Sequence, residues 1–262
     1  MLHRRLLNIA WYVLYVLQWV GGLLLILIGA ALKADLAKVS KWSALAGGTL
    51  SWLQSTGWFS LTLLTLGLGL AELLRKLLGP PWVWGVIRDL LDQFQGYVFR
   101  DKGNEPLHFH RVTLFKYCRW RVCFSRWPWS GWLMPVERSG HTTRRKISVF
   151  LAPDDADRAE GIAGQTWAQN QVVLVSDLPS LEGNAVPQEV IKEYARSTWI
   201  SEEWAHCRRP QARSFCGIPV EVKGKLWGVI VIDSRGTKIA GRTSVQVYTL
   251  VGRFLGKLLE KV

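Results

Sequence analysis

Few residues of this sequence are suited to a metal or redox centre. Only four cysteines occur in the 262 residues, no two of them form a CxxC pair, and they are Cys118, Cys123, Cys207 and Cys216. Structural zinc sites use cysteine or histidine ligands at short, regular spacings, which are absent here. We therefore expect no metal and no cofactor, with the cysteines as reduced thiols. His206 beside Cys207 leaves a haem or redox sensor open as an alternative.

The sequence also lacks the motifs of the common enzyme classes. No serine, histidine and acid set, no cleft-type pair of carboxylates and no glycine-rich phosphate loop can be assembled from it. These absences predict that the protein is not an enzyme.

Charge is missing from two long segments near the N-terminus, residues 6–32 and 42–71. Each is longer than the roughly 20 apolar residues that a helix needs to cross a bilayer core of about 30 Å. A cleaved signal peptide would not be followed by a second apolar run. We expect two transmembrane helices, which make residues 1–78 a membrane hairpin.

Basic residues flank both expected spans. Arg4 and Arg5 precede the first, and Arg75, Lys76 and Arg88 follow the second. Because loops rich in Lys and Arg stay on the cytoplasmic side, both termini and the rest of the chain are expected in the cytoplasm. The expected location is a bacterial inner (plasma) membrane.

The second span carries a stripe of hydroxyl residues at helical spacing, formed by Ser51, Ser55, Thr62 and Thr65. Small and hydroxyl residues let helices approach closely and hydrogen bond in lipid. The stripe predicts either packing within the hairpin or contacts between subunits. We expect a homo-oligomer.

A linker, residues 79–106, follows the hairpin. Gly79, Pro80 and Pro81 end the second helix, since proline lacks the amide donor. Residues 83–94 then alternate apolar and charged positions in the pattern of a short amphipathic helix.

Residues 107–262 have the texture of an α+β domain. Short β-rich runs are expected as strands at 111–123, 147–150, 172–176, 214–222 and 227–233. Helical segments are expected at 156–170, 187–199 and 243–259. Between the first two strands, the tryptophans at 127, 129 and 132 and the basic run 138–146 are expected to form a long loop, over a ligand or on the bilayer. The fold class predicted for the whole chain is an α-helical transmembrane hairpin plus an antiparallel sheet flanked by helices.

Several segments of this domain, in the right order, resemble the GAF domain family. They are Gly161-Ile-Ala-Gly-Gln-Thr-Trp, Val172-Val-Leu-Val-Ser-Asp-Leu-Pro, Ser214-Phe-Cys-Gly-Ile-Pro-Val and Gly224-Lys-Leu-Trp-Gly-Val-Ile-Val-Ile-Asp, with Arg111-Val-Thr-Leu-Phe as the first strand. The resemblance implies a pocket between the sheet and a helical layer that binds a small molecule. It does not name the ligand.

Seven residues of the domain are suited to line such a pocket. Aromatic rings can stack on a ligand, and arginine and hydroxyl groups can hold its polar edges. The predicted ligand-binding residues are Arg138, Trp167, Asp177, Tyr194, Thr198, Arg213 and Trp227. The tryptophans also fit a role in the core, and Asp177 also fits a turn cap.

A net charge of +13 suits an anionic ligand or an anionic membrane surface. The basic residues are scattered rather than gathered in a stripe, so polymeric nucleic acid is not expected as a partner. The expected partners are the lipid bilayer, a small molecule such as a nucleotide second messenger, and further copies of the chain. The sequence thus predicts a membrane-anchored ligand sensor that switches the hairpin, for example as a membrane-disrupting antiviral defence or stress effector. The alternative is a ligand-free GAF module that dimerises and signals to a separate partner.

Overall fold

The structure, a computed structural model, describes residues 2–33, 44–100, 106–119, 131–140, 148–153, 155–183, 186–239 and 244–261. The chain divides into two compact units, Met1–Pro81 and Trp82–Lys261. Each unit is described by itself.

The described residues of the first unit form two long helices, α1 (Leu2–Lys33) and α3 (Ala44–Leu78). Two helical stretches, Asn8–Ala31 and Ser55–Val98, are long and apolar enough to cross a membrane. Many large apolar side chains along α1 and α3 are exposed, among them Ile26, Trp58 and Phe59 at 70% or more. By length and composition both stretches are candidate membrane spans, whereas the membrane anchoring, the orientation and the bacterial inner membrane stay predictions.

The helices α1 and α3 pack along each other and share a charged cluster. Gln18 on α1 donates a hydrogen bond of 2.7 Å to Glu72 on α3, and Arg75 forms an ion pair of 2.8 Å with the same carboxylate. The Arg75 guanidinium also lies 5.6 Å from the ring centres of Trp11 and Tyr15. Glu72, the first acid after the uncharged run, therefore has a cationic partner within the hairpin, as ionisable groups near lipid require.

The second unit is built on a six-stranded antiparallel sheet in the order β3-β2-β1-β6-β5-β4. Its strands are β1 (His110–Cys118), β2 (Trp132–Arg138), β3 (Phe150–Leu151), β4 (Val173–Val175), β5 (Ser214–Val222) and β6 (Lys225–Ser234). A tight turn at Lys223 and Gly224, both with positive φ, joins the long strands β5 and β6. An antiparallel sheet with helices was predicted, and the fold confirms it.

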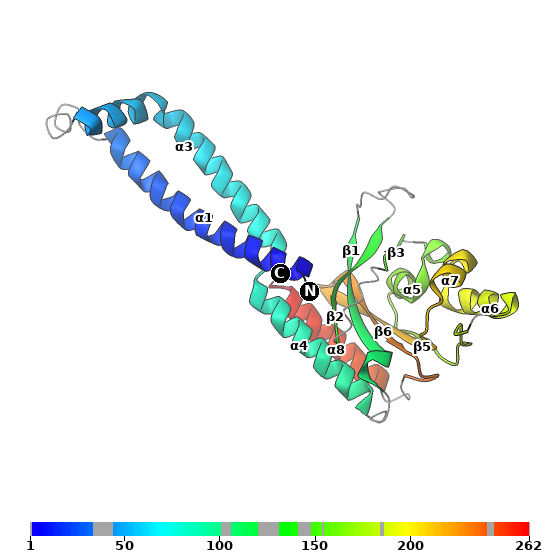
Figure 1. The fold of residues 1–262 in the computed structure, drawn as a ribbon. Helices are drawn as coiled ribbons and strands as arrows, with labels where there is room; N and C mark the ends of the chain where they lie inside the picture. The colour runs from blue at the N-terminus through cyan, green and yellow to red at the C-terminus, as the bar shows by residue number, and fades with distance from the viewer. Residues whose placement is uncertain are drawn as a thin grey trace. The chain divides into compact units, whose positions relative to one another are not determined.

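Helices cover both faces of this sheet (Figure 1). One face carries α4 (Pro81–Val98) and α8 (Ser244–Leu259), which meet through an edge-to-face contact of Phe94 with Tyr248. The other face carries η3 (Ala156–Arg158), α5 (Gly161–Gln169), α6 (Gln188–Thr198) and α7 (Glu202–Arg208). The short helix η2 (Leu107–Phe109) precedes β1.

Two apolar clusters fill the space between the sheet and the α5 to α7 layer. Phe115, Val229 and Val231 of the sheet pack with Ala163 of α5 in the first cluster. In the second, Ile191, Tyr194 and Ala195 of α6 pack with Leu178, Leu181 and Ala205. This packing holds α5 and α6 against the strands.

Two elements differ from the sequence-based expectations. Residues 132–138, expected in a loop, form strand β2, and α7 was not expected. The predicted strand 111–123 is β1, which ends at Cys118. The tryptophans at 127 and 129, Cys123 and residues 141–146 of the basic run lie outside the described residues.

Candidate functional site

Four polar side chains gather where β1, β2 and β6 lie side by side. The strand register pairs Arg111 with Asp233 and Thr113 with Arg138. Along β1, Arg111 and Thr113 alternate on the same face as Phe115, which packs in the α5 cluster. The Arg138 cluster, defined as Arg111, Thr113, Arg138 and Asp233, therefore lies on the sheet face that α5 to α7 cover.

Arg111 and Asp233 form the ion pair of this cluster. The Arg111 Nε donates to the Asp233 Oδ1 at 2.7 Å, across the β1 and β6 pair. The neighbouring Asp233 charge raises the pKa of Arg111, against the opposing effect of burial. The carboxylate is thus already engaged by one of the two arginines.

Arg138 has no carboxylate of its own among the described residues. Its Nε donates to the Thr113 Oγ1 at 3.1 Å, and its Nη1 and Nη2 groups form no hydrogen bond with a described residue. Burial lowers the pKa of the Arg138 guanidinium, and the neighbouring Arg111 lowers it further. Both effects disfavour the charged form of the guanidinium, so an anion bound at Nη1 and Nη2 would stabilise that charged form.

Tyr194 of α6 lies within electrostatic range of the same cluster. It is almost fully buried, and its hydroxyl donates to the Ala212 carbonyl at 2.8 Å. Burial raises the pKa of Tyr194, and the Asp233 charge adds to this increase. Tyr194 is therefore a neutral hydroxyl within electrostatic range of Arg111 and Asp233.

The other predicted ligand residues lie elsewhere in the unit. Trp167 stacks on Tyr117 with ring centres 4.0 Å apart, and the buried Thr198 hydroxyl donates to the Tyr194 carbonyl. Trp227 lies under Lys116, six residues before Asp233 on β6, which corresponds to about 20 Å along a strand.

Arg213 and Asp177 lie in the segments that precede β5 and follow β4. The Arg213 Nε donates to the Leu178 carbonyl at 2.9 Å. Asp177 is exposed with a positive φ, and its backbone N–H donates to the Thr237 carbonyl. Both residues hold together the segments that precede β5 and follow β4. Of the predicted ligand-binding residues, the structure brings only Arg138 and Tyr194 to the Arg138 cluster.

Sequence reasoning missed Arg111, Thr113 and Asp233 as site residues. The available signal was their position, since Arg111 and Thr113 alternate at the start of one predicted strand and Asp233 ends another. Placing them together requires the pairing of β1 with β6, which joins residues more than 100 positions apart.

The described residues hold no group of three or more metal-ligating side chains. Cys207 is exposed and Cys216 is buried within β5. The Arg138 cluster instead combines two guanidinium groups with one carboxylate, which is a donor-rich, positively charged arrangement suited to a carboxylate or phosphate.

The hydroxyl stripe of α3 is exposed in the single chain. The hydroxyls of Ser55, Thr62 and Thr65 each donate to a backbone carbonyl three or four residues earlier in their own helix. Ser51 is exposed as well. The hydroxyls of Ser55, Thr62 and Thr65 are satisfied without a partner helix, so these three residues can face lipid or another subunit.

Comparison with known proteins places this fold. The GAF domain family profile matches residues 70–256, which is more than half of the chain. No curated protein matches the chain.

Among solved structures, the chain is similar to the GAF domain of an Acinetobacter phosphoenolpyruvate-protein phosphotransferase, with 12% identity, TM-score 0.41, and coverage of 66% of this chain and 81% of that one. It is also similar to a type II free methionine-R-sulfoxide reductase from Thermoplasma acidophilum, with 15% identity, TM-score 0.39 and coverage of 68% and 96%. A third similar structure, residues 122 to 287 of a methyl-accepting chemotaxis protein, has 19% identity, TM-score 0.40 and coverage of 68% and 88%. At these values none of the three supports an argument about activity. On the extent of the family match, this chain belongs to the GAF domain family.

Proposed function

We propose that the GAF domain of this chain binds a small anionic molecule at the Arg138 cluster and that binding switches the hairpin of α1 and α3. GAF domains are typically ligand-binding and signalling modules. The observation that carries the proposal is the Arg138 guanidinium, which is partly buried beside Arg111 and has two Nη groups without a described partner. The expectation that the domain is not an enzyme stays a prediction.

The charge balance of the cluster favours an anion. The cluster holds two arginines but one carboxylate, Asp233, which is hydrogen bonded to Arg111. A buried charge without a partner is unfavourable, and a guanidinium binds a carboxylate or phosphate through two parallel hydrogen bonds. Hydrogen bonds to charged groups each contribute about 1.5–3 kcal/mol, so bonds from the two Nη groups would favour a ligand that presents a carboxylate or phosphate.

A nucleotide second messenger fits these requirements, since it presents phosphates to the arginines. The same chain carries two helices apolar enough to cross a membrane, so the hairpin is available as the output. The proposed role is a bacterial antiviral defence or stress effector whose hairpin disrupts the inner membrane when the ligand is bound.

Dye-loaded liposomes that contain the full chain test this role. We expect leakage on addition of at least one member of a panel of cyclic mono- and dinucleotides. Arg138→Gln should abolish that leakage, whereas Arg196→Gln, which removes an exposed arginine of α6, should leave it unchanged. Absence of leakage with every member of the panel, or equal leakage from the Arg138→Gln chain, contradicts the proposed role.

One observation favours the alternative of a ligand-free dimerising anchor. Leu250 and Phe254, one helical turn apart on α8, are 66% and 55% exposed. Exposed apolar side chains at this spacing suit a helix contact with a second copy. A bound small molecule in the purified protein separates the two functions, because the anchor requires none.

A further inference from the structure

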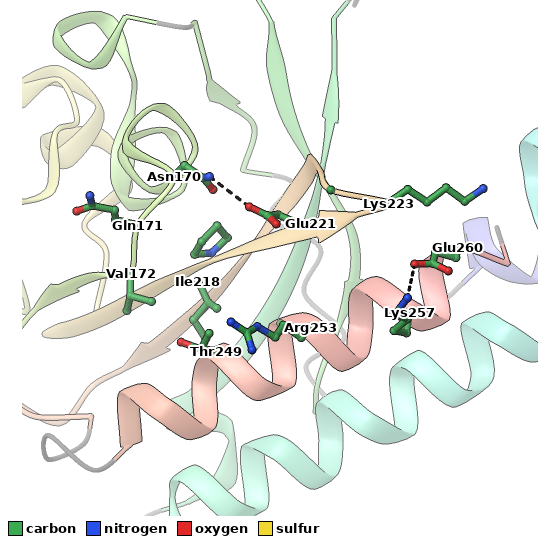
Figure 2. Close-up of a pocket in the computed structure, with 13 residues that line it drawn as sticks. Asn170, Gln171, Val172, Ile218, Glu221, Lys223, Thr249, Arg253, Lys257 and Glu260 are labelled. Carbon is green, nitrogen blue, oxygen red and sulfur yellow. Dashed lines mark hydrogen bonds and ion pairs between the residues drawn. The ribbon is translucent and has the colours of Figure 1, made fainter.

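A pocket of about 510 Å³ lies between the end of β5, the segment before β4 and α8 (Figure 2). Three parts of the GAF domain line it: the segment before β4 (residues 170–172), the end of β5 with its turn (residues 218–224), and α8 from Thr249 onward with Glu260, which follows the helix. Ligand pockets in proteins have volumes of roughly 300–1,000 Å³, so a small organic molecule fits this one.

Two glycines of α8 determine the shape of this pocket. A Cβ at Gly256 would lie 2.0 Å from the Glu221 carbonyl oxygen, and one at Gly252 would lie 3.0 Å from the Pro219 carbonyl oxygen. The helix thus crosses β5 in backbone contact, and no side chain from these two positions fills the adjacent space. The pocket is therefore set by rigid elements rather than by a loop alone.

Arg253 is one of the basic residues that line this pocket. Figure 2 shows its guanidinium extending from α8 beside Ile218 and Thr249. No hydrogen bond or ion pair joins Arg253 to another residue in the part of the chain that the structure describes. An anion can therefore bind it without displacing an existing contact.

The two acids that line the pocket are already engaged. Glu221 accepts a hydrogen bond from the Asn170 amide at 3.3 Å, and Glu260 pairs with Lys257 at 3.1 Å. Figure 2 shows both interactions on the rim. With Lys223, Arg253 and Lys257 against these two acids, the lining is positively charged overall.

The floor of the pocket is apolar. Val172 and Ile218 come from the sheet side, and Ile218 has 1% of its surface exposed. Pro219 lines the pocket too, but it alternates with Ile218 along β5, so its ring lies on the face that α5 covers. An apolar body can lie against Val172 and Ile218 while an acidic group reaches Arg253, since ligand sites combine an apolar lining with few polar groups.

We propose that this pocket is a second ligand site, which binds an organic anion with its carboxylate or phosphate at Arg253 and its apolar body against Val172 and Ile218. Both a soluble metabolite and an anionic lipid have this chemistry. The site does not share a residue with the Arg138 cluster, so either can be wrong without the other.

Isothermal titration with 1-naphthyl phosphate tests the site on the full chain in phosphatidylcholine nanodiscs. The titration is run with the native chain and with the Arg138→Gln chain, so that binding at the Arg138 cluster is separated. In both, we expect a saturable binding phase that Arg253→Gln weakens at least about tenfold, because it loses a charge-assisted hydrogen bond. Arg196→Gln serves as the control for loss of an exposed arginine and should change the Kd by less than about twofold.

Two results would overturn the second site. One is the absence of saturable binding in the Arg138→Gln chain, which would show that 1-naphthyl phosphate binds at the Arg138 cluster and not in this pocket. The other is an unchanged Kd in the Arg253→Gln chain. Inorganic phosphate should bind much more weakly than 1-naphthyl phosphate, and equal binding of the two would exclude the role of the apolar floor.

Nanodiscs with added phosphatidylglycerol identify the source of the anion. If an anionic lipid occupies the pocket, the apparent Kd for 1-naphthyl phosphate rises as phosphatidylglycerol is added. An unchanged Kd assigns the pocket to soluble anions. Both results keep the chemistry of the site and decide between its two sources.

Discussion

At the residue scale, the position of Arg138 determines what the GAF domain is suited to bind. The side chain lies across β1 from an existing ion pair, that of Arg111 with Asp233, and donates only its Nε to a described residue. Had Asp233 lain opposite Arg138 instead, the charge of Arg138 would be neutralised within the fold. Its Nη groups are therefore the donors on which the proposed ligand depends.

Cysteine reactivity gives a residue-scale prediction. Burial raises the pKa of Cys216 to about 12, while Cys207 on α7 is exposed. Because the thiolate is the nucleophile, iodoacetamide at pH 8 should alkylate Cys207 and should alkylate Cys216 at least about 100-fold more slowly. Mass spectrometry of peptides from the native chain measures both rates.

Denaturation in urea is the control for this prediction, since it should make the two cysteines react at similar rates.

The raised pKa of Cys216 also makes the free energy of unfolding depend on pH, because the folded state holds the Cys216 proton more tightly than the unfolded state. The stability that Cys216 contributes is complete below pH 9.0, the ordinary pKa of a cysteine, and is lost as the pH rises towards 12. Equal alkylation of Cys207 and Cys216 in the native chain would show that β5 is not packed as described.

At the scale of elements, β2 shows why part of the sheet could not be predicted. Its sequence contains Pro135 and ends in two charged residues, which argues against a strand. The strand β3 pairs only with Trp132 and Leu133, so β2 is an edge strand from Met134 onward. Proline is tolerated on an edge strand. Which part of β2 forms the edge depends on the length of β3, and that length is set only in the assembled sheet.

The long strands β5 and β6, by contrast, could be predicted locally. Their apolar residues are continuous, and the turn at Lys223 and Gly224 separates them. The short helix α7 did carry a signal, because the Ser201 hydroxyl caps it by accepting from the Trp204 N–H and two acids follow. Its seven residues contain no apolar period long enough to detect.

Two helical glycines give a matched prediction at this scale. Gly256→Ala places a Cβ 2.0 Å from the Glu221 carbonyl oxygen, so α8 must move away from β5, at a cost of about 1–3 kcal/mol. Gly96→Ala on α4 meets nothing within 4 Å and should stabilise by up to about 1 kcal/mol, since alanine favours helix. Thermal unfolding of the full chain in detergent, followed by circular dichroism, compares the two.

The contrast between these variants is the test. If Gly256→Ala unfolds at the same temperature as Gly96→Ala, the close approach of α8 to β5 is wrong. Hydrogen exchange should localise the loss in Gly256→Ala to α8 and the end of β5, with β1 and β2 less affected.

At the scale of the whole molecule, the chain combines a GAF domain with two helices that are apolar enough to cross a membrane. The change from uncharged runs to β-rich segments made this division visible in the sequence. The ligand, the homo-oligomer and the cytoplasmic orientation remain predictions. The site was only partly predictable, because Arg138 and Tyr194 come together with Arg111 and Asp233 only through the register of β1, β2 and β6.

Native mass spectrometry of the full chain, purified from its membrane in detergent, tests the central claim most directly. The account predicts that the native chain carries an additional small anionic molecule, released on denaturation, and that the Arg138→Gln chain does not carry it while Arg196→Gln does. A native chain without any bound small molecule, with or without the nucleotide panel added, would contradict the ligand-sensing account. Equal occupancy in the Arg138→Gln chain would contradict the assignment of the Arg138 cluster as its site.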